Sequence, residues 1–155
     1  MSEVKRIEDQ YRRSYQGEAW QGPGLLEILE GITAEKAAAH PIAGLHSIWE
    51  ILGHLVAWQD VFERRLAGIA VNNLPEDQNF PPVANATESA WEKMKETVER
   101  SCKRMQETIS RLPEERLNDV VPGKSYTFYF MYFMAHGTIQ HNLYHAGQIA
   151  ILRKA

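Results

Sequence analysis

Apolar residues recur every three or four positions along most of this chain, which is the spacing of one face of an α-helix. The first such row consists of Val4, Ile7, Tyr11 and Tyr15, and Gly17 follows it. After a short break, the pattern resumes at Pro23, a residue suited to the first position of a helix because its missing N–H costs nothing there. The first helix is therefore predicted to be broken.

The next rows are longer and have recognisable starts. Thr33 is a suitable cap for a short helix over 34–39. Ser47 and Glu50 form a capping-box pattern that predicts a helix from residue 48 to about residue 70. The apolar face of that helix comprises Ile48, Leu52, Leu55, Phe62, Leu66 and Ile69.

A third long helix is predicted to begin after a cap at Asn85 or Thr87 and to end before Pro113. Its apolar row comprises Trp91, Met94, Val98, Cys102, Met105, Ile109 and Leu112. Because the only cysteine belongs to this row, a buried, inert thiol is expected. Two segments, 71–86 and 118–125, are rich in turn residues and are expected to be loops that shape a substrate pocket.

Residues 127–154 predict a final helix that is apolar on more than one side. One side carries Phe130, Met134, His141, His145, Gln148 and Leu152. The other carries Tyr132, Ile139, Leu143, Ala146 and Ala150, and we expect this second face to contribute to a homodimer contact. Together these rows predict an all-α fold: one four-helix-bundle domain over residues 1–155, with a broken first helix.

Composition argues against several classes of partner and site. The net charge of −3 gives no electrostatic reason to expect nucleic acid as a partner. A single cysteine excludes an internal disulfide and a zinc site built from several cysteines. No stretch is long and apolar enough to cross a membrane or to act as a signal peptide, so a cytoplasmic location is the default expectation.

Histidine spacing supplies the candidate chemistry. His141 and His145 stand four residues apart and therefore share one helix face, where two neutral imidazoles can bind one metal ion. Alone, this spacing also occurs among ordinary polar or packing residues. It is not the metalloprotease motif, because Asn142 occupies the place of the glutamate base. A di-iron carboxylate site is not expected either, because the chain has no Glu-x-x-His pair.

His54, at the edge of the buried face of the second long helix, is the candidate third ligand if the two helices are neighbours. Three imidazoles with one open position describe a catalytic type of metal site. Trp58 is expected to pack beside the site. Gln148 could contact substrate or water or be an ordinary core residue, and Glu50 could support His54 although its cap already explains it.

These residues make the chain recognisable. It resembles the DinB/YfiT-like family of metal-dependent enzymes through Ser47-Ile-Trp-Glu50 leading to His54 and Trp58, and through His136-Gly-Thr-Ile-Gln-His141-Asn-Leu-Tyr-His145-Ala-Gly-Gln-Ile149 with Arg153 one turn later. The resemblance covers essentially the whole chain. It implies an up-down-down-up bundle, frequent dimerisation and metal binding by His54, His141 and His145. All-nitrogen ligation suits a divalent transition metal such as Zn, Ni or Fe and does not select one.

Two functions follow from the resemblance and the residues. The first is a metal-dependent enzyme acting on a small molecule, either a hydrolase or an S-transferase that uses a low-molecular-weight thiol. The second is a non-catalytic metal-binding protein of the stress-response, DNA-damage-inducible type. A bundle that binds no metal is a third interpretation. The sequence does not choose the metal or the substrate, because the same fold and ligands serve different reactions.

Overall fold

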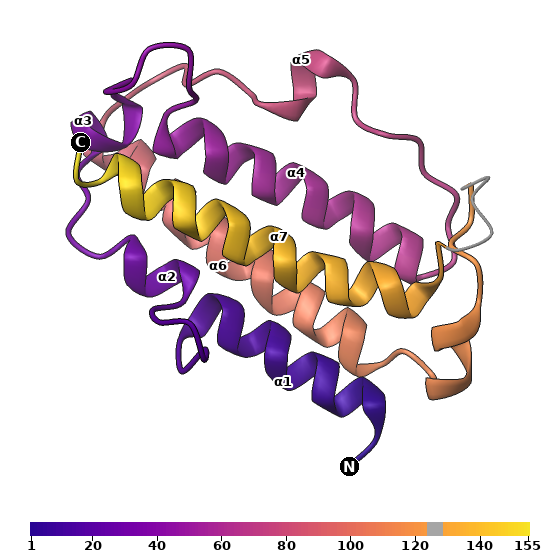
Figure 1. Cartoon of the computed structure of the whole chain (residues 1–155). Coiled ribbons are helices and arrows are strands. Elements are labelled where there is room, and N and C mark those ends of the chain that lie inside the picture. Colours follow the sequence, from indigo (N-terminus) through magenta and orange to yellow (C-terminus); the bar gives the residue numbers. More distant parts are fainter. Residues whose placement is uncertain (124–128) are drawn as a thin grey trace.

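Four long helices lie side by side in the structure (Figure 1): α1 (Glu3–Gln16), α4 (Ile48–Leu66), α6 (Glu88–Ser110) and α7 (Met131–Leu152). The structure is a computed structural model that describes residues 1–123 and 129–155. Both α1 and α4 pack against α6 and α7. Within the described residues there are helices and no strands, so the prediction of an all-α fold is confirmed.

The directions of the long helices can be followed in Figure 1. Helices α1 and α7 run one way, whereas α4 and α6 run the other way. The segment between α4 and α6 crosses the length of the molecule, which lets these two helices run in the same direction. The up-down-down-up order of a four-helix bundle stays a prediction, with which these directions agree.

Short helices connect the long ones: α2 (Leu25–Ile28), α3 (Ala34–Ala38), α5 (Glu76–Asn79) and the 3₁₀ helix η1 (Glu114–Asn118). Pro23 was predicted to be a first helical residue, but α2 begins at Leu25 after its N-cap Gly24. Segment 71–86 was predicted to be a long irregular connection, yet it contains α5. A four-residue helix is too short to produce an apolar periodicity, which explains why the pattern missed it.

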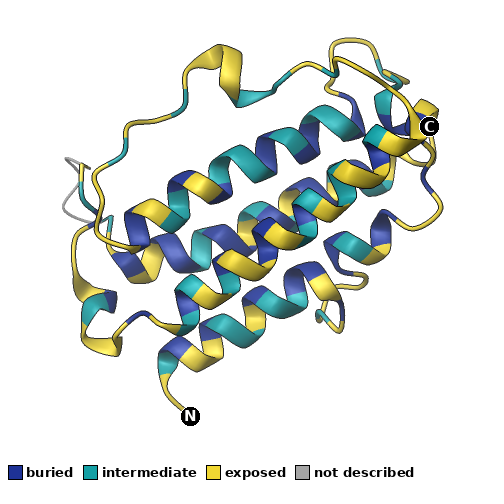
Figure 2. Ribbon diagram, turned by 180° about the vertical axis from the view of Figure 1, so that it is seen from behind, coloured by how far each residue is buried: buried dark blue, intermediate teal, exposed yellow. Residues whose placement is uncertain are grey.

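The predicted apolar rows form the core (Figure 2). Val4, Ile7, Tyr11 and Tyr15 of α1 are buried, as are most residues of the α6 row. Cys102 is fully buried, and burial raises the pKa of its thiol to about 11, which agrees with an inert thiol. Ile69 differs from the prediction: it lies beyond the end of α4 and is 48% exposed.

Side-chain caps at the beginnings of α3, α4 and α6 test the predicted helix starts. The Ser47 hydroxyl accepts from the Glu50 amide at 3.2 Å, and the Glu50 carboxylate accepts from the Ser47 amide at 2.8 Å. The Thr33 hydroxyl caps α3 in the same manner. Thr87, rather than Asn85, caps α6 by accepting from the Ala90 amide. The predicted capping box at the start of α4 is therefore present.

The last helix is shorter than the predicted range of 127–154. It begins at Met131, and residues 127 and 128 lie outside the described residues, as do Lys124 and Ser125 of the expected loop 118–125. Before the helix, Tyr129 and Phe130 are extended and pair with the segment 119–121. Phe130 is the N-cap of α7 and is 37% exposed, so it does not extend the histidine row as predicted.

The second apolar face of α7 is partly explained within the chain. Ile139 and Ala146 are buried, because α7 packs against α1 and α2 as well as α4. Tyr132 on the same face is 45% exposed. The homodimer contact stays a prediction. None of the described helices has the length and apolar character needed to cross a bilayer.

The capping box leads directly into the helix that carries His54, and its contribution can be measured. Replacing Ser47 with Ala should lower the free energy of unfolding by about 1 kcal/mol, because the Glu50 amide loses its acceptor. Urea unfolding with an unchanged m-value would measure this loss. Ser47→Thr, which retains a capping hydroxyl, is the matched control. An equal loss in both variants would contradict the capping role.

Candidate metal centre

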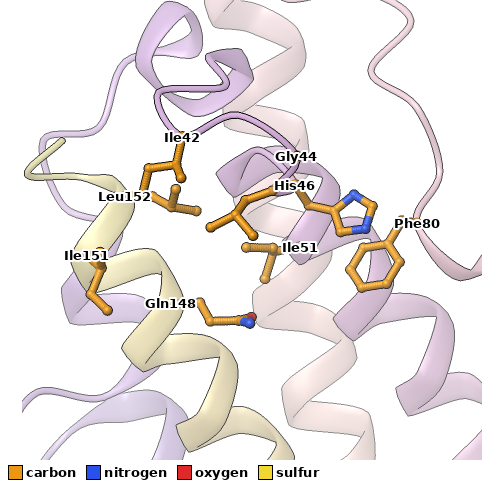
Figure 3. Close-up of a pocket in the computed structure, with 9 residues that line it drawn as sticks. Ile42, Gly44, His46, Ile51, Phe80, Gln148, Ile151 and Leu152 are labelled. Atoms are coloured by element: carbon orange, nitrogen blue, oxygen red, sulfur yellow. The ribbon is translucent and has the colours of Figure 1, made fainter.

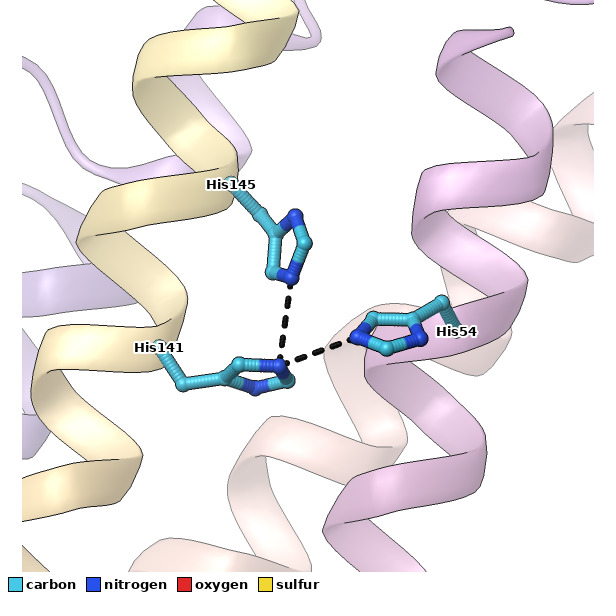
Figure 4. Close-up of side chains that lie close together, drawn as sticks. All are labelled: His54, His141 and His145. Atoms are coloured by element: carbon cyan, nitrogen blue, oxygen red, sulfur yellow. Dashed lines mark hydrogen bonds between the residues drawn. The ribbon is translucent and has the colours of Figure 1, made fainter. Parts of the chain in front are cut away.

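Three imidazoles from two helices meet at one point (Figure 4). Helix α4 supplies His54, and α7 supplies His141 and His145. The Nε2 atom of His141 lies 3.1 Å from Nε2 of His54 and 3.1 Å from Nε2 of His145. The convergence expected from the sequence is thus confirmed as geometry, whereas metal ligation by these residues stays a prediction.

Hydrogen bonds on the far side of two rings select their tautomers. Nδ1 of His54 lies 2.8 Å from the carbonyl oxygen of Asn79, and Nδ1 of His145 lies 2.6 Å from Oε1 of Gln148. An oxygen acceptor places the ring proton on Nδ1, which leaves a lone pair on Nε2. The lone pairs of His54 and His145 therefore both face Nε2 of His141. A proton on that atom can point fully at only one of them, whereas a cation between the rings would satisfy all three nitrogens.

The surroundings keep the rings neutral. Burial, reinforced by the neighbouring His145 and His54, lowers the pKa of His141 to about 3. Burial also lowers the pKa of His145 to about 4, although its hydrogen bond to Gln148 opposes this shift. Burial lowers the pKa of His54, and the hydrogen bonds that its ring makes to Asn79 oppose this shift. Neutral imidazole is the form that binds metal, so the cluster is ready for a cation at neutral pH.

The donor set and spacing fit a tetrahedral transition metal. Zn–N distances of about 2.0–2.1 Å place neighbouring tetrahedral ligands about 3.3 Å apart, close to the two Nε2 separations of 3.1 Å. All three ligand atoms lie within 4.8 Å of one another. Three nitrogen ligands leave one tetrahedral position for water or substrate, and they suit Zn, Ni or Fe without selecting one.

The other predicted site residues lie as follows. Gln148 supports His145 by accepting its ring proton. Trp58 packs beside His54, with ring centroids 6.3 Å apart, and its indole donates to Oδ1 of Asn79 at 2.8 Å. The Glu50 carboxylate bonds to the Ser47 amide and to Nε2 of His40, and no contact of Glu50 with the three imidazoles is found in the described part of the chain.

Sequence reasoning missed Asn79 and Phe80. Asn79 holds both His54 and Trp58, through its carbonyl and its side chain. The Phe80 ring stacks between two imidazoles, 4.1 Å from His54 and 3.7 Å from His46. Both residues belong to the connection 71–86, for which the only available signal was its length and its Pro- and Asn-rich composition.

Two cavities lie near the cluster, and one of them borders it. An open cleft of about 430 Å³ is lined by His54, Trp58, Phe62, Arg65, Asn73, Asn79, Tyr129 and His141. A smaller apolar pocket of about 150 Å³ lies beyond Gln148 and Phe80 (Figure 3). Since two of the three imidazoles line the open cleft, a small molecule entering it can reach the cluster.

Fold and site together define a helical protein with a three-histidine centre of the metal-binding type. The model of the DinB superfamily matches residues 19–149, and the chain belongs to this superfamily. A comparison with curated proteins finds none that matches. A conserved protein from Enterococcus faecalis, known from its crystal structure, has a similar fold, with a TM-score of 0.73 at 16% sequence identity. The alignment covers 99% of this chain and 96% of that protein.

The cluster makes a direct prediction about metal content. His141→Ala should abolish stoichiometric binding of Zn²⁺ by the untagged protein, because it removes the nitrogen that faces both other rings. Elemental analysis after dialysis against zinc would measure this. His136→Ala removes an imidazole outside the cluster from the same helix and should leave binding unchanged. Equal zinc content in the two variants would contradict the assignment of ligands.

The lowered pKa values predict how the metal-free protein responds to acid. Unfolded histidines titrate near 6.5, whereas His141 and His145 titrate at about 3 and about 4 in the fold. The unfolded chain therefore takes up protons first, and stability should fall as the pH drops from about 6.5 towards 4. Urea unfolding at several pH values should show a smaller fall for a variant carrying His141→Gln and His145→Gln. The same fall in both proteins would argue against buried, neutral rings.

Proposed function

We propose that this protein is a metal-dependent enzyme that acts on a small molecule at the three-histidine centre. The observation that carries the proposal is the arrangement of the ring nitrogens. Asn79 and Gln148 orient two Nε2 lone pairs towards a third nitrogen, beside a cleft that a small molecule can enter. A structural metal site would have four protein ligands, whereas the described residues offer three here, which would leave one position for water or substrate.

A divalent ion held by these nitrogens would supply Lewis-acid activation of a water or a thiol at neutral pH. Two reactions suit that chemistry: hydrolysis of a small molecule and transfer of a low-molecular-weight thiol to an electrophile. The chain's own residues bind and orient. His54 and His141 line the cleft, Trp58 and Phe62 provide aromatic walls, and the amide of Asn79 lies close by.

One observation supports a second candidate function, non-catalytic metal binding in a stress response. The described residues that line the open cleft include no carboxylate, so the chain offers no obvious general base beside the cluster. Activation of water or thiol would then depend on the ion alone. The two candidates differ in whether the protein converts substrates.

A substrate panel distinguishes the candidates. Protein loaded with Zn²⁺, Ni²⁺ or Fe²⁺ should turn over at least one member of a panel of small esters, amides and electrophile–thiol pairs. His141→Ala should lower that turnover by roughly a hundredfold or more, because a metal ion contributes several kcal/mol to such reactions. His136→Ala serves again as the control. Stoichiometric metal binding without turnover of any pair would favour the non-catalytic function, and undiminished turnover by His141→Ala would exclude catalysis at this cluster.

A further inference from the structure

Arg65 is a buried cation in the same cleft as the three-histidine centre. It is 1% exposed and lies on α4, on the helix face that also carries His54, Trp58 and Val61. Arginine is rarely buried so completely unless it is paired. Its position on the histidine-bearing face, rather than on the solvent face, calls for an explanation.

The guanidinium is only partly satisfied by the protein. Nε and Nη2 donate to the carbonyl oxygen of Val71 at 3.2 and 2.9 Å, and Nη2 also donates to Oδ1 of Asn73 at 3.1 Å. The carbon Cζ lies 6.0 Å from the centroid of the Trp58 ring. For the two N–H groups on Nη1, the described residues provide no acceptor. One edge of the guanidinium thus binds the connection after α4, and Nη1 has no hydrogen-bond acceptor among residues 1–123 and 129–155.

The positive charge also lacks a counter-ion. No carboxylate of the described residues forms an ion pair with Arg65, and residues 124–128 contain no Asp or Glu. The carboxylate of the nearby Glu63 bonds to Arg104 instead. Arginine remains charged at neutral pH even where burial lowers its pKa. A buried charge without a partner is destabilising, and an anionic ligand would supply the missing partner.

The cleft connects this cation to the metal centre. Arg65, His54 and His141 all line it, together with Trp58 and Asn79. His54 and Arg65 are eleven positions apart on one helix, which corresponds to about 16 Å along its axis. The Trp58 ring links the two side chains, because its centroid lies 6.0 Å from Cζ of Arg65 and 6.3 Å from the His54 ring centroid. The guanidinium is therefore no more than about 12 Å from the His54 imidazole.

We propose that Arg65 binds an anionic oxyacid group, a carboxylate or a phosphoryl group, of the molecule whose other end reaches the three-histidine centre. The substrate class is then an elongated small molecule with a reactive group at one end and a negative charge at the other. The part of this statement that concerns the reactive end rests on the proposed function. The anion site at Arg65 stands independently of it.

The anion site can be tested on metal-free protein. Hexanoate and hexyl phosphate are titrated into ¹⁵N-labelled protein, and 1-hexanol serves as the uncharged control. The side-chain Nε–H resonance of Arg65 should shift in a saturable manner with at least one of the two anions and not with hexanol. Whichever anion binds more tightly identifies the group. An unchanged Arg65 resonance with both anions would overturn the proposal and leave Arg65 as a holder of residues 71–73.

The anion affinity of Arg65 variants is a second test of the proposal. Arg65→Met should weaken binding of the preferred anion roughly tenfold or more, since a hydrogen bond between charged groups is lost. Arg111→Met, which removes an exposed cation at the C-terminal end of α6 that pairs with Glu107 and does not line the cleft, should bind like the wild type. If Arg65→Met fails to fold, Arg65→Lys keeps the charge while removing the planar fork, and weaker binding by a folded Lys variant supports the proposal. Unweakened binding by either folded Arg65 variant would contradict it.

An experiment with cobalt-loaded protein tests whether one ligand contacts both Arg65 and the metal centre. Mercaptocarboxylates of increasing chain length are compared with mercaptoalcohols of the same length, and thiolate binding is followed by the charge-transfer absorption of Co²⁺. The carboxylate should improve affinity roughly tenfold at one chain length, and Arg65→Met should remove that advantage. Equal affinity of the two series at every length would overturn the proposal while leaving the metal function intact. If hexanoate shifts the Arg65 resonance but no thiol binds the cobalt, the thiol-transfer reaction is excluded and the anion site stands.

Discussion

The structure of the site depends on two hydrogen bonds made on the outer sides of the imidazoles. The Asn79 carbonyl and the Gln148 amide oxygen accept the Nδ1 protons of His54 and His145, and this leaves unprotonated nitrogens facing inwards. Burial reinforces the effect by keeping the rings neutral. Inward-facing lone pairs oppose one another unless something positive lies between them. This arrangement suits a cation between the rings, and metal binding itself stays a prediction.

Polar contacts inside the core help to set the rotation of α7. Asn142, next to His141, is buried, and its amide nitrogen donates to the Ser14 hydroxyl of α1 at 3.0 Å. Its oxygen lies 3.4 Å from the amide nitrogen of Gln59 on α4, which in turn lies 3.4 Å from the Cys102 sulfur of α6. A neighbouring residue points about 100° away around a helix, so a rotation that directs Asn142 into the core turns His141 towards the cleft. Polar groups that must find specific partners can specify such a register where apolar contacts alone would tolerate several.

The connection between α4 and α6 makes three kinds of contact with residues of the site. Val71 and Asn73 hold the Arg65 guanidinium, Asn79 orients His54, and Phe80 covers its ring. The helices supply the imidazoles, and the connection supplies the cover and the walls of the cleft. This division is common in enzymes, where a rigid scaffold positions loops that determine the substrate. It also separates the two cavities, because Phe80 borders the apolar pocket while Asn79 lines the open cleft.

Local patterns in the sequence were sufficient to predict the long helices and to select the three candidate histidines. The apolar rows of α1 and α6, the caps at Ser47 and Thr87, and the pairing of His141 with His145 all follow from spacing within one helix, because helical periodicity is a local property. His54 could be nominated from its position at the edge of a buried face. Only the tertiary structure decided that its ring meets the other two, that Asn79 and Gln148 choose the tautomers, and that Arg65 shares the cleft. The contacts of His54 with His141 and with Asn79 join residues far apart in the chain, and a four-residue helix such as α5 leaves no periodic trace from which they could be read. The bond from His145 to Gln148 lies within one turn of α7, but the choice between a core contact and this bond needed the side-chain positions.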